Sequence, residues 1–359
     1  MLYATGMFVP DPFIYLNVRG RGYAVLSDLE LARAGKEIRN CRPLSLSACL
    51  RSLEREGVKS PGLAEVAHLL LRRHRLKKVA VPGTFPHGLA RRLRVLKVKV
   101  KLKSGAVFPE REIKSVVEVK KISAALVMAE VGLAEGIQAL KSAKITKDGR
   151  LLYHNVPLTA EKLRGIINVA ILQAGGHGSN TIVACGRQAC CPHERGHGVL
   201  RAHQPIVMDV FPRSQKTGYY GDITRTVVRG RAGEAVRKLH QTVLRAQEIA
   251  FDRLRHRAEA AAVHAAAAEF FEREGYRTGR RNGQMQGFIH GLGHGLGLEI
   301  HEAPRLSENS PDRLRAGQVV TIEPGLYYPG IGCVRIEDVA LITGNGPRNL
   351  TKFDKVLEV

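Results

Sequence analysis

The sequence predicts an α+β protein of two domains, and three observations lead to this fold class. The chain has 359 residues, of which 44% are hydrophobic, so it is long and apolar enough to bury two cores. Phe108-Pro109 interrupts a first set of strand and helix patterns, and a long helical pattern follows. Beyond that helix, the patterns favour helices packed on a mostly antiparallel sheet. We therefore predict domains at residues 1–110 and 111–359.

The first domain is predicted to mix strands and helices. Residues 13–27 alternate around the turn-forming Gly20 and Gly22, which predicts a hairpin. Residues 96–103 alternate between apolar residues and lysines, which is typical of a strand whose lysines protect an exposed edge. The alternative, a nucleic-acid groove, lacks interleaved aromatic residues. The other predicted elements are helices at 44–57 and 61–76 and a short strand at 79–81.

The second domain opens with a long helical pattern and then alternates between helices and strands. Thr159 can cap one helix, with Glu161 in its first turn, and Gly275 can end another. The predicted helices span 112–141, 159–172, 233–254 and 258–274. The predicted strands lie near 205–211, 219–229, 318–323 and 333–343.

The chain is strongly basic, with a formal net charge of +23 and a pI of about 10.1. Such a charge can indicate binding to nucleic acid, an anionic membrane or acidic peptides. Here the positive charge is spread along the chain and not confined to a tail, which favours a generally basic proteome or an unusual growth environment. We therefore predict neither a nucleic-acid nor a membrane partner, and the reason for the charge stays open.

The cysteines and the N-terminus indicate a soluble cytoplasmic protein. None of the six cysteines forms a CxxC motif, so we expect small buried thiols in a reducing compartment. Cys190 and Cys191 are adjacent, and the sequence assigns them no role. The first residues lack the basic start and apolar run of a signal peptide. No apolar stretch reaches the roughly 18 residues that a membrane-spanning helix needs.

Five potential metal ligands follow one another in the second domain, each in or beside a predicted strand. They are Asp209, Asp222, His294, Glu323 and Glu337. Four carboxylates can neutralise and bridge two divalent ions, and an imidazole can fill a terminal position. Asp209 is flanked by apolar residues, where a charge is costly unless it is paired or metal-bound. For Asp222, capping of a turn is an alternative. Together the set predicts a hydrolytic site with two metal ions.

The segment from His290 to His301 holds three histidines among many glycines. His290 and His294 have the i, i+4 spacing of a helical zinc protease, but the glutamate after the first histidine is missing. Each of the four glycines would cost a helix roughly 1 kcal/mol. We therefore predict an extended or looped segment, in which glycine lets the backbone approach a ligand closely.

Two further residues have more than one interpretation. Arg335 and Glu337 are two apart on one predicted strand and share a face, so they could form a plain salt bridge. Because the other predicted ligands precede this pair along the chain, Arg335 is better interpreted as support for a metal-bound Glu337. His193 lies in a predicted loop, either as a surface residue or as an acid or hydrogen-bond donor that contacts substrate.

These segments resemble those of the pita-bread metallopeptidases, above all the proline aminopeptidases and prolidases. The similarity runs from about residue 115 to 350 in ACGRQACCPH, MDVFPRSQKTGYYGDITRT, IHGLGHGLGLEIHEAP, TIEPGLY and VRIED. The first domain is similar in size and pattern to the creatinase-type N-terminal domain. The resemblance implies a C-terminal pita-bread fold at 111–359 and a smaller, creatinase-like α/β domain at 1–110.

The resemblance also implies roles for the residues named above. Asp209 would bind one ion, His294 and Glu323 the other, and Asp222 and Glu337 would bridge both. The ions would be Mn²⁺, with Co²⁺ or Zn²⁺ as alternatives, and a hydroxide between them would be the nucleophile.

Four further side chains would act on the substrate or shape the site. By the resemblance, His193 and His301 would hold the substrate and stabilise the oxyanion, His290 would line the pocket, and Arg335 would fix the geometry. Glu323 would also handle the proton of the attacking water. A homodimer is the expectation from the resemblance.

The predicted function is a metal-dependent exopeptidase that cleaves the Xaa-Pro bond of peptides or dipeptides. A methionine aminopeptidase-like enzyme is one alternative, but it usually has Gln where Arg335 stands and lacks a first domain of this size. A peptidase-like binding module and a creatinase-like, metal-free hydrolase are others, and the complete ligand set argues against both. The sequence leaves open whether the enzyme is a dipeptidase or an aminopeptidase, and which residue it prefers before proline.

Overall fold

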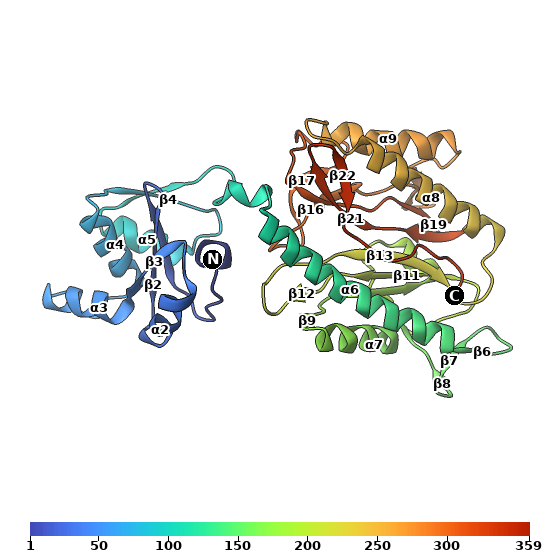
Figure 1. The fold of residues 1–359 in the computed structure, drawn as a ribbon, viewed down its shortest axis with the longest axis horizontal. Helices are drawn as coiled ribbons and strands as arrows, with labels where there is room; N and C mark the ends of the chain where they lie inside the picture. Colours follow the sequence, from blue (N-terminus) through green and yellow to red (C-terminus); the bar gives the residue numbers. More distant parts are fainter. The chain divides into compact units, whose positions relative to one another are not determined.

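The computed structural model describes residues 1–359, which form two compact units, Met1–Arg111 and Glu112–Val359 (Figure 1). In the first unit the helices are α1 (Leu2–Thr5), α2 (Asp28–Glu37), α3 (Leu46–Arg55), α4 (Leu63–Arg73) and α5 (His87–Val95). Its strands are β1 (Ile14–Val18), β2 (Arg21–Leu26), β3 (Cys41–Ser45), β4 (Lys78–Val81) and β5 (Lys99–Leu102), and the 3₁₀ turn η1 (Pro109–Glu112) follows.

The first unit confirms the predicted hairpin and both predicted helices. β1 and β2 pair antiparallel around Arg19 and Gly20, which both have positive φ, and β3 joins β2 in parallel. β4 and β5 form a separate parallel pair. The strand predicted at 96–103 is shorter than expected because α5 continues to Val95 and Lys97 turns the chain with a φ of 63°. The sequence also missed α2 and α5.

The second unit contains four long helices, α6 (Val116–Ser142), α7 (Ala160–Gln173), α8 (Glu234–Arg253) and α9 (Ala260–Arg273), and the 3₁₀ turn η2 (Gly186–Cys190). Its first strands are β6 (Lys144–Ile145), β7 (Leu151–Tyr153), β8 (Val156–Pro157), β9 (Gly176–His177), β10 (Ile182–Cys185), β11 (Pro205–Val210), β12 (Arg213–Ser214) and β13 (Ile223–Val228). The later strands are β14 (Gly279–Arg281), β15 (Gln284–Gln286), β16 (Gly293–Gly295), β17 (Glu302–Leu306), β18 (Val319–Ile322), β19 (Gly325–Tyr328), β20 (Gly332–Arg335), β21 (Asp338–Thr343) and β22 (Gly346–Asn349).

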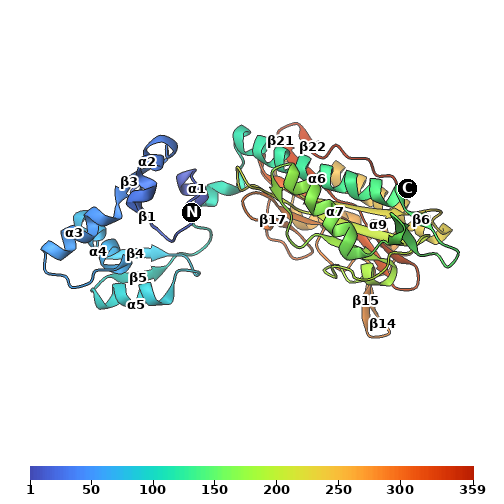
Figure 2. The same ribbon diagram turned by 90° about the horizontal axis from the view of Figure 1, so that it is seen from below.

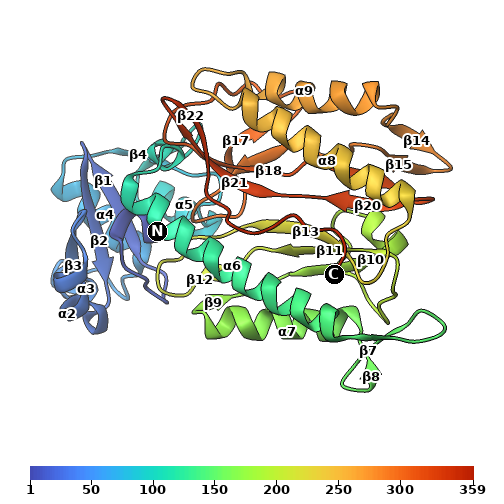
Figure 3. The same cartoon turned by 45° about the vertical axis from the view of Figure 1, so that its right-hand side comes forward.

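Two antiparallel sheets carry the second unit, each with its own pair of helices (Figure 3). One sheet has the order β10-β11-β13, and its core is shared with α6 and α7. The other has the order β17-β16-β18-β21-β22, and its core is shared with α8 and α9. This arrangement confirms the predicted α+β class, with helices on mostly antiparallel sheets. The β14–β15 hairpin, which the sequence did not predict, projects from the unit (Figure 2).

Local chemistry explains where the helices of this unit begin and how closely they pack. α6 begins at Val116, later than predicted, because Ser115 and Glu118 form a capping box that fixes its first turn. Thr159 caps α7 as expected by accepting from the Lys162 amide. A Cβ on Gly132 of α6 would lie 2.6 Å from the Ile171 side chain, so glycine lets α7 approach this closely.

The strand predicted at 333–343 is wrong in one respect that matters for the site. The segment forms two strands, since β20 ends at Arg335 and β21 begins at Asp338. β20 pairs with β19 in a two-stranded sheet, whereas β21 belongs to the five-stranded sheet. The alternation of apolar and polar residues cannot show that the two halves of this segment pair with different strands. The sequence therefore did not predict the break at Ile336–Glu337.

Candidate metal centre

The five predicted ligands come from strands of both sheets of the second unit. Asp209 lies on β11, Asp222 directly before β13, His294 on β16, Glu323 directly after β18, and Glu337 between β20 and β21. Single ligand atoms of Asp222, His294 and Glu337 all lie within 4.8 Å of one another. His294 Nε2 also lies 3.4 Å from Glu323 Oε1 and 3.7 Å from Asp222 Oδ2. Four of the five residues therefore form one cluster, in which Asp222, His294 and Glu337 are buried and the Glu323 side chain is 18% exposed.

Strand register brings the two aspartates to one face. In the β11–β13 pair, Asp209 lies opposite Thr224. Because side chains alternate along a strand, Asp222 shares its face with Thr224, two residues further on, and therefore with Asp209. The loop between the aspartates turns at Gly218, which has a φ of 75°, and both side chains stay on this face.

The glycines around His294 allow strands to come very close. A Cβ at Gly293 would lie 1.9 Å from the carbonyl oxygen of Thr321 on β18. Any larger residue would push β16 away from β18 and would separate His294 from Glu323, which directly follows β18. The extended form of this segment, predicted from its glycines, is confirmed.

Burial and mutual repulsion make the cluster unfavourable for carboxylate charges in the metal-free chain. Burial, followed by repulsion from Glu337, raises the pKa of Asp222 well above its ordinary value. Burial, followed by repulsion from Glu323, does the same to the pKa of Glu337. The pKa of Glu323 rises to about 7, chiefly through burial. Several acids that cannot all ionise without a counter-charge are what a cation site requires.

His294 adds a lone pair aimed at these acids. Its Nδ1 lies 3.1 Å from the carbonyl oxygen of Gly295, which can only accept, so Nδ1 carries the proton and Nε2 does not. Burial, followed by the charge of His301, lowers the pKa of His294 to about 3, so the ring stays neutral. An unprotonated nitrogen that faces Asp222 and Glu323 fits these residues as ligands of a divalent cation, because a cation between them would satisfy all three groups.

Arg335 contacts a different carboxylate from the one that the sequence suggested. Its Nη2 lies 2.5 Å from Asp209 Oδ2, and both side chains are largely buried. It reaches Glu337 only through Thr224, whose hydroxyl donates to Glu337 Oε2 at 2.8 Å and accepts from Arg335 Nε at 3.4 Å. Arg335 thus contacts Asp209 directly and Glu337 through the Thr224 hydroxyl. The strand break after Arg335 removes the shared face on which that expectation rested.

Tyr327 links Arg335 to His290, and sequence reasoning missed it. Arg335 Nη1 donates to the Tyr327 hydroxyl at 3.0 Å. His290 Nδ1 donates to the Gly291 carbonyl at 2.7 Å, so its Nε2 accepts from the tyrosine hydroxyl at 2.8 Å. Burial, followed by the charge of Arg335, lowers the pKa of His290 to about 3, which keeps the ring neutral. The only sequence signal for Tyr327 was its place in the segment TIEPGLY. The only sequence signal for Thr224 was its position two residues after Asp222.

We expect Tyr327→Phe to destabilise the fold by about 1–3 kcal/mol, because Arg335 and His290 would each lose a buried partner. Urea unfolding measures this cost. Tyr328→Phe is the matched control, since the Tyr328 hydroxyl donates to the Arg277 carbonyl in an exposed position. Equal stability of the two variants would contradict the proposed link.

His193 and His301 lie beside the ligand cluster. The His301 ring contacts the His294 ring edge-on, with centroids 4.4 Å apart. Burial, followed by the charges of Arg305 and His193, lowers the pKa of His301. A charge on His193 likewise contributes to lowering the pKa of His290. His193 itself is exposed in the turn after η2, so it can face solvent or an incoming ligand.

A model of metallopeptidase family M24 matches residues 120–344, which include all nine predicted site residues. This chain belongs to metallopeptidase family M24. As a relative, a protein from Pyrococcus horikoshii named Xaa-Pro dipeptidase is 31% identical over 295 residues, which are 79% of this chain and 75% of that protein. The M24 member is therefore a hydrolase that uses metal ions.

Two solved structures are similar to this M24 member over nearly its whole length. The X-Pro aminopeptidase from Thermotoga maritima is 24% identical, with a TM-score of 0.82 over 100% of this chain and 93% of that one. The prolidase from Pyrococcus furiosus is 26% identical, with a TM-score of 0.80 over 98% and 94% of the two chains. This likeness confirms the predicted pita-bread fold.

No helix of the M24 member combines the length and the apolar character that crossing a membrane would require.

Proposed function

We propose that this M24 metallopeptidase hydrolyses the Xaa-Pro bond at the N-terminus of peptides or in dipeptides. The observation that carries the proposal is the cluster of Asp222, His294, Glu323 and Glu337. The names of the relative and of the two similar structures support the specificity for proline. We further propose that residues 111–359 form the catalytic domain and that residues 1–110 form a creatinase-like domain.

The cluster and Asp209 would hold two divalent ions, Mn²⁺ for preference and Co²⁺ or Zn²⁺ as alternatives. Asp209 would serve one ion, His294 and Glu323 the other, and Asp222 and Glu337 both. When bound, the ions supply Lewis acidity that lowers the pKa of a water so that hydroxide is present near neutral pH.

The remaining residues would bind substrate and move a proton. Glu323 would accept the proton of the attacking water and return it to the leaving nitrogen, since its carboxylate lies 3.4 Å from His294 Nε2 within the cluster. His193 and His301 would donate to the carbonyl oxygen as it gains charge, an effect of several kcal/mol in related chemistry. His290 would line the pocket as a neutral acceptor, and Arg335 would hold Asp209 in place.

The test combines metal analysis with a set of peptides. Purified protein loaded with Mn²⁺ should release the first residue from Ala-Pro and Ala-Pro-Ala, and chelation should stop the reaction. Preference for the dipeptide or the tripeptide separates a dipeptidase from an aminopeptidase. Release of methionine from Met-Ala-Ala without cleavage of proline peptides would instead favour a methionine aminopeptidase-like enzyme. Protein without metal or activity would favour a binding module.

We also propose a cytoplasmic homodimer that binds neither membranes nor nucleic acid. Light scattering of the purified protein gives its mass, and a monomer would contradict this part of the proposal.

We expect His193→Ala to lower turnover by about 10²–10⁴-fold, the range typical of a lost acid or hydrogen-bond donor, while metal content stays normal. The reason is that His193 lies exposed beside the cluster and is not one of its grouped ligand atoms. His197→Ala, an exposed histidine four residues further on, is the matched control and should stay active. Loss of metal from the His193 variant would make it a ligand and would contradict this role.

A further inference from the structure

Two of the clustered carboxylates lie where the strands are interrupted. Glu323 lies between β18 and β19, and Glu337 lies between β20 and β21. The two gaps face each other, because the amide of Ile336 donates to the carbonyl of Pro324 at 3.4 Å. The amide of Glu323 donates to the Leu292 carbonyl at 2.8 Å, and the amide of Glu337 donates to the Thr224 carbonyl at 3.0 Å. The gaps still lack a continuous ladder of backbone hydrogen bonds, so side chains also help to fix their position. The separation of these carboxylates therefore depends on what holds the gaps.

One buried side-chain amide joins the two gaps. Gln247, on α8, is 1% exposed. Its Nε2 donates to the carbonyl of Ile322 at 2.9 Å and to the carbonyl of Ile336 at 3.1 Å. These two residues immediately precede Glu323 and Glu337. Both hydrogens of the amide are thus used to hold the two carboxylate-bearing segments together from the side of α8.

The orientation of this amide is itself fixed. Gln247 Oε1 accepts from Lys355 Nζ at 2.6 Å, and Lys355 also pairs with Asp338 Oδ2 at 2.6 Å. Asp338 in turn accepts from Arg225 Nη2 at 2.8 Å. A flipped amide would turn its oxygen toward the two carbonyl oxygens and its nitrogen toward the Lys355 ammonium group, so all three hydrogen bonds would be lost.

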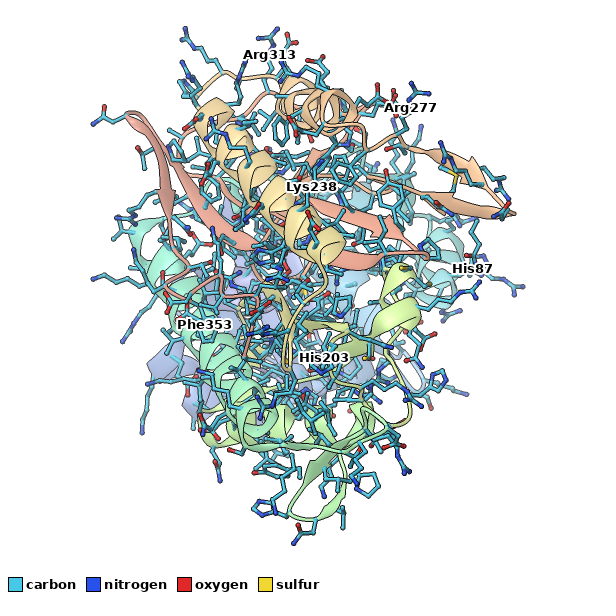
Figure 4. The ribbon with its side chains drawn as sticks, turned by 90° about the vertical axis from the view of Figure 1, so that its right-hand side faces the viewer. His87, His203, Lys238, Arg277, Arg313 and Phe353 are labelled. Carbon is cyan, nitrogen blue, oxygen red and sulfur yellow. The ribbon has the colours of Figure 1, made fainter.

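Arg225 completes the same network on the other side of Glu337. Its Nη1 donates to the Glu337 carbonyl at 2.6 Å, and its Nη2 donates to the Phe353 carbonyl at 2.7 Å. Figure 4 labels Phe353 in the C-terminal segment and Lys238 on α8, the helix that carries Gln247. The backbone around Glu337 is thus held from α8, from β13 and from the C-terminal segment.

We propose that Gln247 is a positioning residue of the metal centre, whose amide sets the separation of Glu323 and Glu337 and thereby the affinity for the ions. Gln247 acts through the backbone of these residues and touches neither substrate nor ion. This inference rests on the proposed function, since it takes both glutamates as ligands. Residues that hold metal ligands in place typically change metal affinity by about 10–100-fold when they are replaced.

Gln318 provides a matched control, because it is also a buried glutamine with two partners. It is 0% exposed, donates to Glu112 Oε1 at 2.5 Å and accepts from the Arg315 amide at 2.6 Å. Neither partner belongs to a gap that carries a ligand. Replacing Gln318 by methionine should therefore bring a similar loss of buried hydrogen bonds without moving the glutamates.

The experiment titrates the metal-free full chain with Mn²⁺ by calorimetry and with Co²⁺ by visible absorption. Gln247→Met should weaken at least one Mn²⁺ site by about 10-fold or more and change the Co²⁺ spectrum. Gln318→Met should stay within about two-fold of wild type, as expected for a substitution remote from the ligands. Unchanged affinity and an unchanged spectrum in Gln247→Met would overturn the proposal.

A second variant keeps the test decisive if Gln247→Met does not fold. Gln247→Glu keeps the size and the contact with Lys355 but turns an oxygen toward the two carbonyls, so it should show the same loss of affinity. Wild-type affinity in this variant would overturn the proposal. A wild-type chain that binds no Mn²⁺ would contradict the proposed function itself. Mn²⁺ binding that is equal in wild type and both variants would contradict only the role of Gln247.

Discussion

Glu337→Ala and Asp222→Ala are each expected to abolish peptidase activity and to remove at least one metal ion per chain. Each side chain is buried in the cluster and offers an oxygen to the same small volume as His294 Nε2. A carboxylate that bridges two ions has no substitute when it is truncated. Loss of the several kcal/mol that the ions contribute corresponds to roughly a 10³-fold slower reaction or worse.

Metal analysis and kinetics on the same preparations test this expectation. Glu269→Ala is the control, because Glu269 is exposed on α9 and far along the chain from the predicted ligands. It should keep full activity and metal content. Circular dichroism separates loss of the fold from loss of the site, since truncating a repelled acid should not unfold the chain. Full activity in either cluster variant would refute the bridging assignment.

The cluster of predicted ligands could be found from the sequence because each residue lies in a short segment whose neighbours indicate its environment. The apolar neighbours of Asp209 made an unpaired charge there costly, which indicated a partner or a metal ion. The glycines around His294 predicted an extended segment, and Gly293 does lie against the backbone of Thr321.

Contacts between distant segments were not predictable. Arg335 pairs with Asp209, on a strand more than a hundred residues earlier, and not with Glu337 two residues later. Arg335 pairs with Asp209 because the strand breaks at Ile336. The break arises because β20 and β21 pair with strands of two different sheets, and the alternation of apolar and polar residues does not show it. Gln247 lies on an amphipathic helix, and its sequence pattern does not distinguish a buried glutamine from an exposed one. Its role follows only from its two carbonyl partners in the structure.

The stability of the metal-free chain is expected to depend on pH through Glu323. Its folded pKa of about 7 exceeds the ordinary value of 4.5, chiefly because it is buried. Below pH 4.5 the carboxyl is protonated in both states and folding carries no penalty. Above this pH the unfolded chain releases the proton while the folded chain keeps it, so stability falls until pH passes about 7. The raised pKa values of Asp222 and Glu337 act in the same direction.

Urea unfolding of chelator-treated wild type and Glu323→Gln between pH 5 and 8 isolates this effect. Both proteins share the buried neutral histidines, which favour stability at higher pH, so the difference between them reports Glu323 together with its repulsion of Asp222 and Glu337. Wild type should lose about 2–3 kcal/mol relative to the variant over this range, from the size of the pKa shift. Added Mn²⁺ should stabilise wild type more at pH 8 than at pH 5, because metal binding must displace the retained protons at the lower pH. Parallel pH profiles of the two metal-free proteins would contradict the raised pKa of Glu323 in the metal-free chain.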